Sequence, residues 1–147
     1  MEVFKSVEEA TNWWIEKIKI PNVYYKGDAT ASGELESFIA YLVACYYRKK
    51  LTKEQIEIFK STLNNLIQKE LEENGFCHFG VDNKPYGILE QARSSSKINK
   101  ILFPWATKVQ VYKDKVLLMR AEGYERKLEE IYEENQKQKR IVKKFKR

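Results

Sequence analysis

The sequence predicts an α+β domain: a helical first half, then a small antiparallel sheet, then a C-terminal helix. Through residue 75, apolar side chains recur every three or four positions, which is the period of one helix face. From Phe76 onward several segments alternate between apolar and polar residues, which is the period of a strand. The chain has 147 residues, 43% of them hydrophobic, which suffices for one domain that we expect to span residues 1–134.

The first helix is predicted to begin at Ser6, because Ser6 and Glu9 have the residue types and spacing of a capping box. Its apolar side chains fall on one face: Val7, Ala10, Trp14 and Ile18. Pro21 should end it, since the residue before a proline disfavours helical conformation. The small residues of 26–33 then form a loop. Helix capping is favoured over phosphate binding there, because acidic side chains flank the loop and would repel an anion.

A second helix is predicted over residues 34–49. Its apolar side chains form a wide stripe that we expect to face the core: Leu35, Phe38, Ile39, Leu42, Val43 and Tyr46. The very short join to the next helix predicts an antiparallel helical hairpin.

The third helix should follow Thr52, which opens a second capping box with Gln55, and should end near Gly75. Its expected buried face consists of Ile56, Phe59, Leu63, Leu66 and Ile67. Beyond it, residues 76–81 read as a strand and residues 82–87 as a turn.

The second half of the chain contains weaker signals. Residues 88–92 fit one or two helical turns, and the polar, serine-rich segment 93–100 is predicted to be a loop. Residues 108–112 and 115–119 are predicted to pair as a hairpin around Lys113-Asp114. A last helix is predicted from about Tyr124, with a sparse apolar stripe at Leu128 and Ile131.

The net charge of +6 is concentrated at the C-terminus. Seven basic residues and no acidic ones lie in 135–147, and the remainder has 20 basic against 21 acidic residues. The tail, which we expect to be a helical extension, fits an arm that binds nucleic acid or an acidic partner. It also fits self-association, because the acidic run of 122–134 precedes it, and two antiparallel copies of such a helix would match in charge. Self-association is favoured, since the body supplies no further positive charge.

Composition also bears on location. The longest apolar stretch, residues 38–47, is about half the roughly 20 residues that a membrane helix needs. The N-terminus shows no secretion signal pattern. Cys45 and Cys77 lie far apart in the sequence, and we expect reduced thiols in a cytoplasmic protein with no membrane contact.

Motifs of catalysis are not found in the sequence, which has no phosphate-binding P-loop, dinucleotide fingerprint, zinc-protease motif or serine-nucleophile elbow. Cys77 and His78 are strand neighbours that point to opposite faces, so a metal site is not expected, and no cofactor is predicted. The enzymatic alternative is a nucleotide-cleaving activity that would use His78, Asp82 and Glu90.

The segment from Phe76 to Arg120 interleaves aromatic rings with cations, as binders of nucleotides do. The rings would stack on a base, carboxamides would read its edge, and cations would pair with phosphates. The predicted ligand-binding residues are Phe79, Asn83, Tyr86, Gln91, Arg93, Trp105, Lys108 and Arg120. The competing interpretation is that the rings pack the core and the lysines are merely solvated.

Three segments follow one another in the second half: Lys84-Pro85-Tyr86-Gly87-Ile88-Leu89-Glu90-Gln91-Ala92, then Phe103-Pro104-Trp105-Ala106-Thr107-Lys108 before the hairpin, then Gly123-Tyr124. This order resembles small phage-encoded anti-defence proteins of the anti-Thoeris sponge family. Proteins of that family bind signals of the cyclic ADP-ribose type and withhold them from the host effector without cleaving them. The resemblance implies an oligomeric, non-enzymatic ligand trap in the host cytoplasm. The alternative is an accessory factor that binds nucleic acid, or blocks a protein, through the basic tail.

Overall fold

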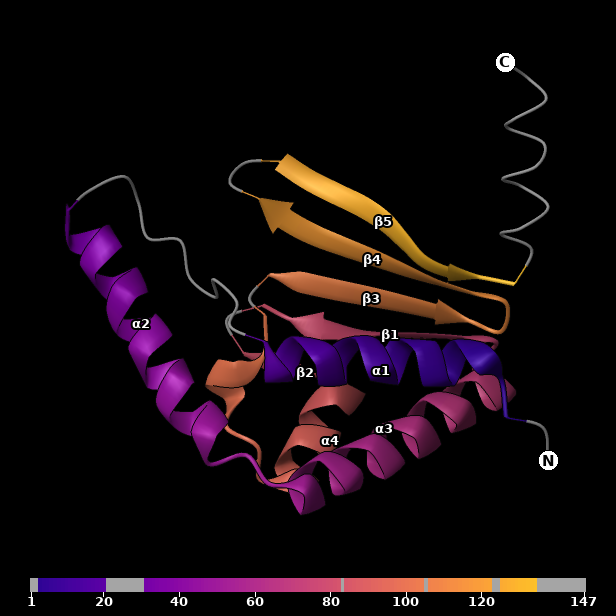
Figure 1. Ribbon diagram of the computed structural model, residues 1–147. Coiled ribbons are helices and arrows are strands. Elements are labelled where there is room, and N and C mark those ends of the chain that lie inside the picture. Colours follow the sequence, from indigo (N-terminus) through magenta and orange to yellow (C-terminus); the bar gives the residue numbers. More distant parts are fainter. Residues whose placement is uncertain (1–2, 21–30, 83, 105, 123–124, 135–147) are drawn as a thin grey trace.

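The computed structural model describes residues 3–20, 31–82, 84–104, 106–122 and 125–134. Its elements are α1 (Lys5–Lys19), α2 (Ala31–Lys49), α3 (Lys53–Asn74), β1 (Phe76–Val81), β2 (Pro85–Tyr86), α4 (Ile88–Ser96), the 3-10 helix η1 (Lys100–Leu102), β3 (Thr107–Tyr112), β4 (Lys115–Glu122) and β5 (Glu125–Glu133). The strands form one antiparallel sheet in the order β2-β1-β3-β4-β5. Helices α1, α3 and α4 lie on one face of this sheet (Figure 1). The predicted α+β class is confirmed.

Helix α1 lies against the sheet through the face that its periodicity predicted. Its four predicted core residues are all fully buried: Val7, Ala10, Trp14 and Ile18. The predicted cap at Ser6 is wrong, because the helix begins one residue earlier and Phe4 is its N-cap. The Ser6 hydroxyl is buried and donates instead to the carbonyl of Lys113 at 3.2 Å, which ties α1 to the β3–β4 turn.

Helix α3 starts and ends as its sequence predicts. The Thr52 hydroxyl accepts from the Gln55 amide at 3.1 Å, and the Gln55 side chain accepts from the Thr52 amide at 3.0 Å. Gly75 ends the helix in the left-handed conformation, with φ of 81°. The fully buried side chains of α3 face α1, α4 and the sheet: Phe59, Leu63, Ile67 and Leu71.

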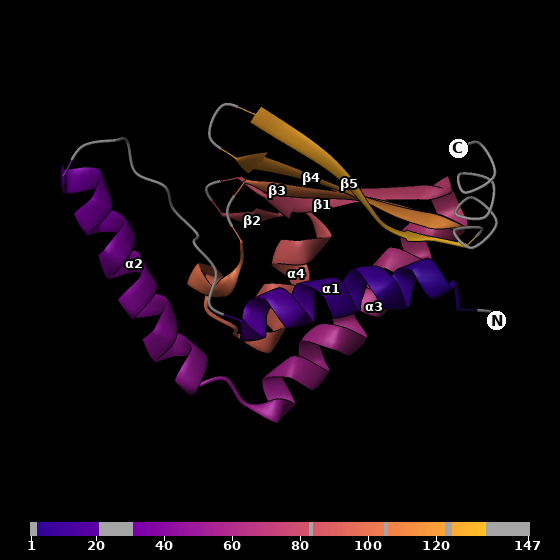
Figure 2. The same ribbon diagram turned by 45° about the horizontal axis from the view of Figure 1, so that its top comes forward.

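The predicted antiparallel hairpin of α2 and α3 is wrong. Figures 1 and 2 both show α2 projecting away from the body that α1, α3 and α4 form with the sheet. The predicted core stripe of α2 lies in solvent: Leu35 is 59% exposed and Phe38 58%. Helices α1 and α4 and the sheet cover the apolar face of α3, and α2 packs against η1 instead. No helix in the described part of the chain could cross a bilayer by length and apolarity.

The sheet has one covered and one open face. Alternation along β1 buries Cys77 and Phe79 beneath the helices and exposes His78 on the other side. The predicted hairpin is confirmed: β3 and β4 pair antiparallel, with Val111 opposite Val116 across the Lys113-Asp114 turn. The open face carries mixed side chains: His78, Lys108, Gln110, Leu117 and Met119.

The predicted C-terminal helix is wrong over residues 125–133, which form strand β5. Pairing with β4 places Leu128 opposite Met119 and satisfies the backbone of an otherwise open edge strand. This strand pairing outweighs a sparse helical stripe, and Leu128 remains 67% exposed. The acidic half of the proposed self-matching helix is therefore a strand. The basic residues 135–147 lie outside the described residues.

Candidate anion-binding cleft

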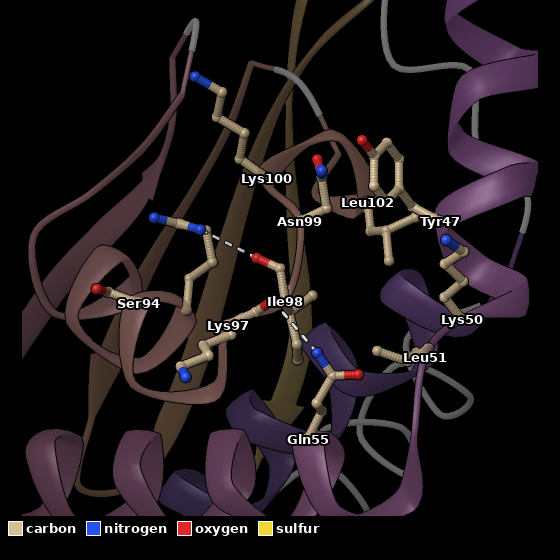
Figure 3. Close-up of a pocket in the computed structure, with 11 residues that line it drawn as sticks. Tyr47, Lys50, Leu51, Gln55, Ser94, Lys97, Ile98, Asn99, Lys100 and Leu102 are labelled. Atoms are coloured by element: carbon tan, nitrogen blue, oxygen red, sulfur yellow. Dashed lines mark hydrogen bonds between the residues drawn. The ribbon is translucent and has the colours of Figure 1, made fainter.

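A cleft of about 540 Å³ lies where four helical segments meet: the end of α2, the start of α3, the end of α4 and η1 (Figure 3). The residues that line it are Tyr47, Lys50, Leu51, Gln55, Arg93, Ser94, Lys97, Ile98, Asn99, Lys100 and Leu102. The segment predicted as a polar loop, 93–100, forms one wall. Its first half is the last turn of α4, so the loop prediction is wrong there.

The wall after α4 is held by side-chain hydrogen bonds. Arg93 donates from Nε to Glu90 at 2.7 Å and from Nη1 to the carbonyl of Ile98 at 3.0 Å. Gln55 of α3 donates to the carbonyl of Lys97 at 3.3 Å. The Asn99 side chain caps η1 by accepting from the Ile101 amide at 2.9 Å. Because these hydrogen bonds already fix the backbone, little conformational entropy is lost when a ligand binds there.

The electrostatics of the cleft favour an anion. Four cationic side chains line it: Lys50, Arg93, Lys97 and Lys100. No carboxylate is among the described lining residues. The Glu90 carboxylate pairs with Arg93, and the hydrogen bond from that guanidinium lowers the pKa of Glu90. Arg93 is therefore partly neutralised and acts mainly to position the wall. The lysines carry the positive charge that a ligand would meet.

Figure 3 shows how these groups surround the cleft. Tyr47 and Lys50 come from the end of α2 on one side, whereas Ser94 and Lys97 come from α4 and its end on the other. The Lys50 ammonium lies 4.5 Å from the centre of the Tyr46 ring, and its hydrogen bond with Tyr46 raises its pKa. The ammonium groups are spread around the rim, which suits an extended anion with separated charges.

The prediction that Phe79 stacks on a ligand is wrong. Its ring is fully buried and lies 6.1 Å, centre to centre, from the ring of Trp14. Phe79 alternates inward on β1, so it belongs to the core beneath the helices. The competing interpretation, that rings of this segment pack the core, holds for this residue.

The other predicted residues do not come together in one site. Tyr86 lies beside His78, with its hydroxyl 3.3 Å from Nε2, and Lys108 pairs with Asp82 at 3.7 Å. Gln91 is exposed on α4. Arg120 stands opposite Thr107 in the β3–β4 register, which directs it to the opposite sheet face from Lys108. Of the described members of the predicted set, only Arg93 lines the cleft. Asn83 and Trp105 lie outside the described residues.

Tyr47, Lys50 and Gln55 of the cleft were absent from the prediction. They end one helix and begin another, about 45 residues before the opposite wall, and no local motif marks them. The packing of α3 against α4 and of α2 against η1 brings the two stretches together. Lys97 and Lys100 belonged to the predicted cationic segment, but their spacing to the aromatic rings did not single them out.

Two other hollows fit an anion less well. One of about 590 Å³ lies near the α2–α3 join, and its described lining residues include the carboxylate of Glu57 and no aromatic ring. A smaller one of about 170 Å³ lies on the open sheet face, where Lys108 is the only cation among its described lining residues. The cleft combines more positive charge with a tyrosine ring, and it is the stronger candidate.

Of the three residues of the enzymatic alternative, Glu90 lies apart from His78. His78 pairs with Tyr86 on the open sheet face, whereas Glu90 pairs with Arg93 on α4, which covers the other face. Within the described residues, no three His, Cys, Asp or Glu side chains gather as a metal site. No protein-family model matches the chain, and no curated protein matches it either. The resemblance to sponge proteins stays a prediction.

Proposed function

We propose that this protein binds a nucleotide-derived anionic small molecule in the cleft between α2, α4 and η1 and holds it without cleaving it. The observation that supports this is the lining: four cations, a tyrosine ring and carboxamide side chains surround about 540 Å³, with no carboxylate among the described lining residues. That volume lies within the roughly 300–1,000 Å³ range of small-molecule sites.

Each kind of side chain in the cleft has a role in this proposal. Lys97 and Lys100 pair with phosphate oxygens, and Lys50 does so from the opposite side. The Tyr47 ring stacks on a base, because any base presents a face to an aromatic ring. Asn99 uses its oxygen to cap η1, which leaves its N–H groups as donors to the edge of the base.

The ligand class follows from the spread of the cations. Charges on two sides of one cleft suit a molecule with a pyrophosphate or with two separate phosphates. The sequence resemblance makes signals of the cyclic ADP-ribose type the first to test. Sequestration of such a signal would make this a phage-type anti-defence protein that acts in the host cytoplasm. Binding of nucleic acid or of a partner protein through residues 135–147 stays the alternative.

The test is calorimetric titration of the full chain with cyclic ADP-ribose isomers, ADP-ribose, and cyclic dinucleotides and trinucleotides. We expect saturable heat with one of these classes, and chromatography of the released ligand should show it unchanged after overnight incubation. Absence of heat with every compound would contradict the proposal, and a chemically altered ligand would contradict binding without cleavage. Truncation after Glu134 should leave this binding intact, whereas the alternative requires that tail.

A further inference from the structure

Helix α2 presents an apolar face to solvent. Six large apolar side chains form this outer stripe, each between 37% and 59% exposed: Leu35, Phe38, Ile39, Leu42, Val43 and Tyr46. Ala44 is fully buried and lies on the opposite side of the helix at 100° per residue. The helix therefore touches the rest of the chain with its less apolar side and turns its more apolar side outward.

The spacing of the outer stripe is that of a helix-pairing seam. Leu35, Ile39, Leu42 and Tyr46 follow each other at steps of four, three and four residues. Alternating steps of this kind place apolar side chains along one seam of a paired helix. We propose that the outer stripe of α2 is a self-association surface, and that two copies of this protein pair through antiparallel α2 helices.

Charge complementarity selects a second copy in antiparallel orientation. Glu36 lies near the N-terminal end of the stripe, and Lys49 lies at the C-terminal end of the helix. Antiparallel pairing that sets Leu35 opposite Tyr46 and Ile39 opposite Leu42 brings Glu36 of each copy to within about one helical turn of Lys49 of the other. Parallel pairing would set like charges against each other at both ends.

The area of the stripe agrees with a dimer contact. Given roughly 150–250 Å² for a fully exposed aromatic side chain and somewhat less for an aliphatic one, the six residues present on the order of 600 Å². Flanking Glu36 and Lys49 add their aliphatic stems. Standard interfaces bury about 800 Å² per partner, so a two-fold α2 contact comes close to that size.

The outer stripe is a different surface from the cleft, although Lys50 of the cleft contacts the Tyr46 ring of the stripe. Tyr47 and Lys50 of the cleft follow directly after the stripe, so pairing would set the end of each cleft near the start of the partner's α2. The dimer contact itself rests only on the outer stripe and its end charges. A failure to bind ligand would not contradict the proposed dimer, and a failure to dimerise would not contradict ligand binding in the cleft.

The first test is the molar mass of the full chain by light scattering during size exclusion at several concentrations. We expect twice the chain mass at the higher concentrations, and a shift to the chain mass in the variant Ile39→Glu/Leu42→Glu. The control is Leu128→Glu, which adds one charge at an apolar residue that is 67% exposed on β5. Far-UV circular dichroism checks that each variant is folded. A wild type of single-chain mass at every concentration would overturn the proposal, as would an Ile39→Glu/Leu42→Glu variant that remains dimeric.

The second test examines orientation. Glu36→Lys alone and Lys49→Glu alone should each weaken the dimer several-fold, and the double swap should restore it. In a Cys45→Ser background, Leu42→Cys should give a disulfide-linked dimer under mild oxidation and Leu35→Cys should not, because the two Leu35 positions are about 20 Å apart in the antiparallel pair. Efficient crosslinking at Leu35→Cys with none at Leu42→Cys would overturn the antiparallel pairing. Monomers that bind phosphatidylcholine vesicles through the stripe would overturn self-association and identify a membrane surface instead.

Discussion

Arg93 donates from Nη1 to the carbonyl oxygen of Ile98 at 3.0 Å, across the point where α4 ends and the chain turns toward η1. The same guanidinium is paired with Glu90 one turn earlier. One side chain therefore joins the last turn of α4 to the segment that carries Lys97, Asn99 and Lys100. Arg93 therefore helps to fix the shape of that cleft wall, together with Gln55 and Asn99.

Replacement of Arg93 by lysine should loosen this wall. Lysine keeps the charge but cannot bond Glu90 and Ile98 together, because it lacks the planar fork of arginine. We expect a loss of about 1 kcal/mol in the free energy of unfolding and a several-fold weaker ligand affinity. Chemical denaturation and calorimetry measure the two effects. Gln91→Ala, at an exposed position of the same helix, is the control and should change neither.

The pairing of Glu90 with Arg93 predicts a pH dependence of stability. The pKa of Glu90 is lowered from its ordinary value of 4.5 by the hydrogen bond from Arg93. A group whose pKa is lower in the folded state stabilises the protein above its unfolded pKa, and this contribution is lost as the pH falls through the folded value. Because the carboxylate is partly exposed, we expect the pair to contribute about 0.5 kcal/mol.

The comparison is between wild type and Glu90→Gln, by urea denaturation at pH 7 and at pH 3. The difference in free energy of unfolding should be present at pH 7 and should shrink toward pH 3. If the difference in the free energy of unfolding instead grew as the pH fell, the stabilisation by the ionised Glu90–Arg93 pair would be contradicted.

Structural features that depend on residues close together in the sequence were easier to predict than features that depend on packing. The Thr52 cap, the Gly75 stop and the β3–β4 hairpin are local, and they were predicted correctly. The orientation of α2 was not, because its apolar stripe looks the same whether it faces its own core or another surface. Strand β5 was missed although its pairing with β4 is also a hairpin, because its sparse apolar residues Leu128 and Ile131 fit a helical period better than strand alternation.

The candidate site was predicted less well than the fold, for a related reason. Phe79 and Tyr86 belong to one aromatic-rich stretch, yet strand alternation and register direct Phe79 into the core and leave Tyr86 beside His78 on the open face. Lys50 joins the cleft only through the packing of distant helices. A linear cluster of rings and cations could not show which side chains converge in space.

Gly80 is required where β1 and β3 approach each other. A Cβ at this position would lie 2.2 Å from the carbonyl oxygen of Thr107 and 2.8 Å from the Cα of Lys108. Both atoms are backbone, so Gly80→Ala must shift a strand, and we expect a cost of about 1–3 kcal/mol. Gly75→Asn is the contrasting variant, because nothing lies within 4 Å of its Cβ and asparagine tolerates the left-handed conformation. Equal melting temperatures for the two variants would contradict the close approach.

The two thiols should differ in reactivity. Both are free in the structure, and burial raises the pKa of Cys77 to about 12, whereas Cys45 is only half-buried on α2. At pH 8 we expect one thiol per native chain to react rapidly with Ellman's reagent, since the thiolate is the reacting form. Cys45→Ser should abolish the rapid reaction and Cys77→Ser should preserve it. Two rapid thiols in the folded protein would mean that β1 is not covered as described.

The most direct measurement of the central claim is the ligand affinity of a charge-reversed cleft. Lys97→Glu/Lys100→Glu replaces two lining cations by carboxylates, and Lys60→Glu/Lys69→Glu makes the same change in net charge at exposed positions of α3 outside the cleft. We predict that calorimetry with the ligand identified for the wild type shows at least a hundredfold weaker binding to the cleft variant and a change of less than threefold for the α3 variant. Equal affinities for the two variants would contradict the assignment of this cleft as the binding site.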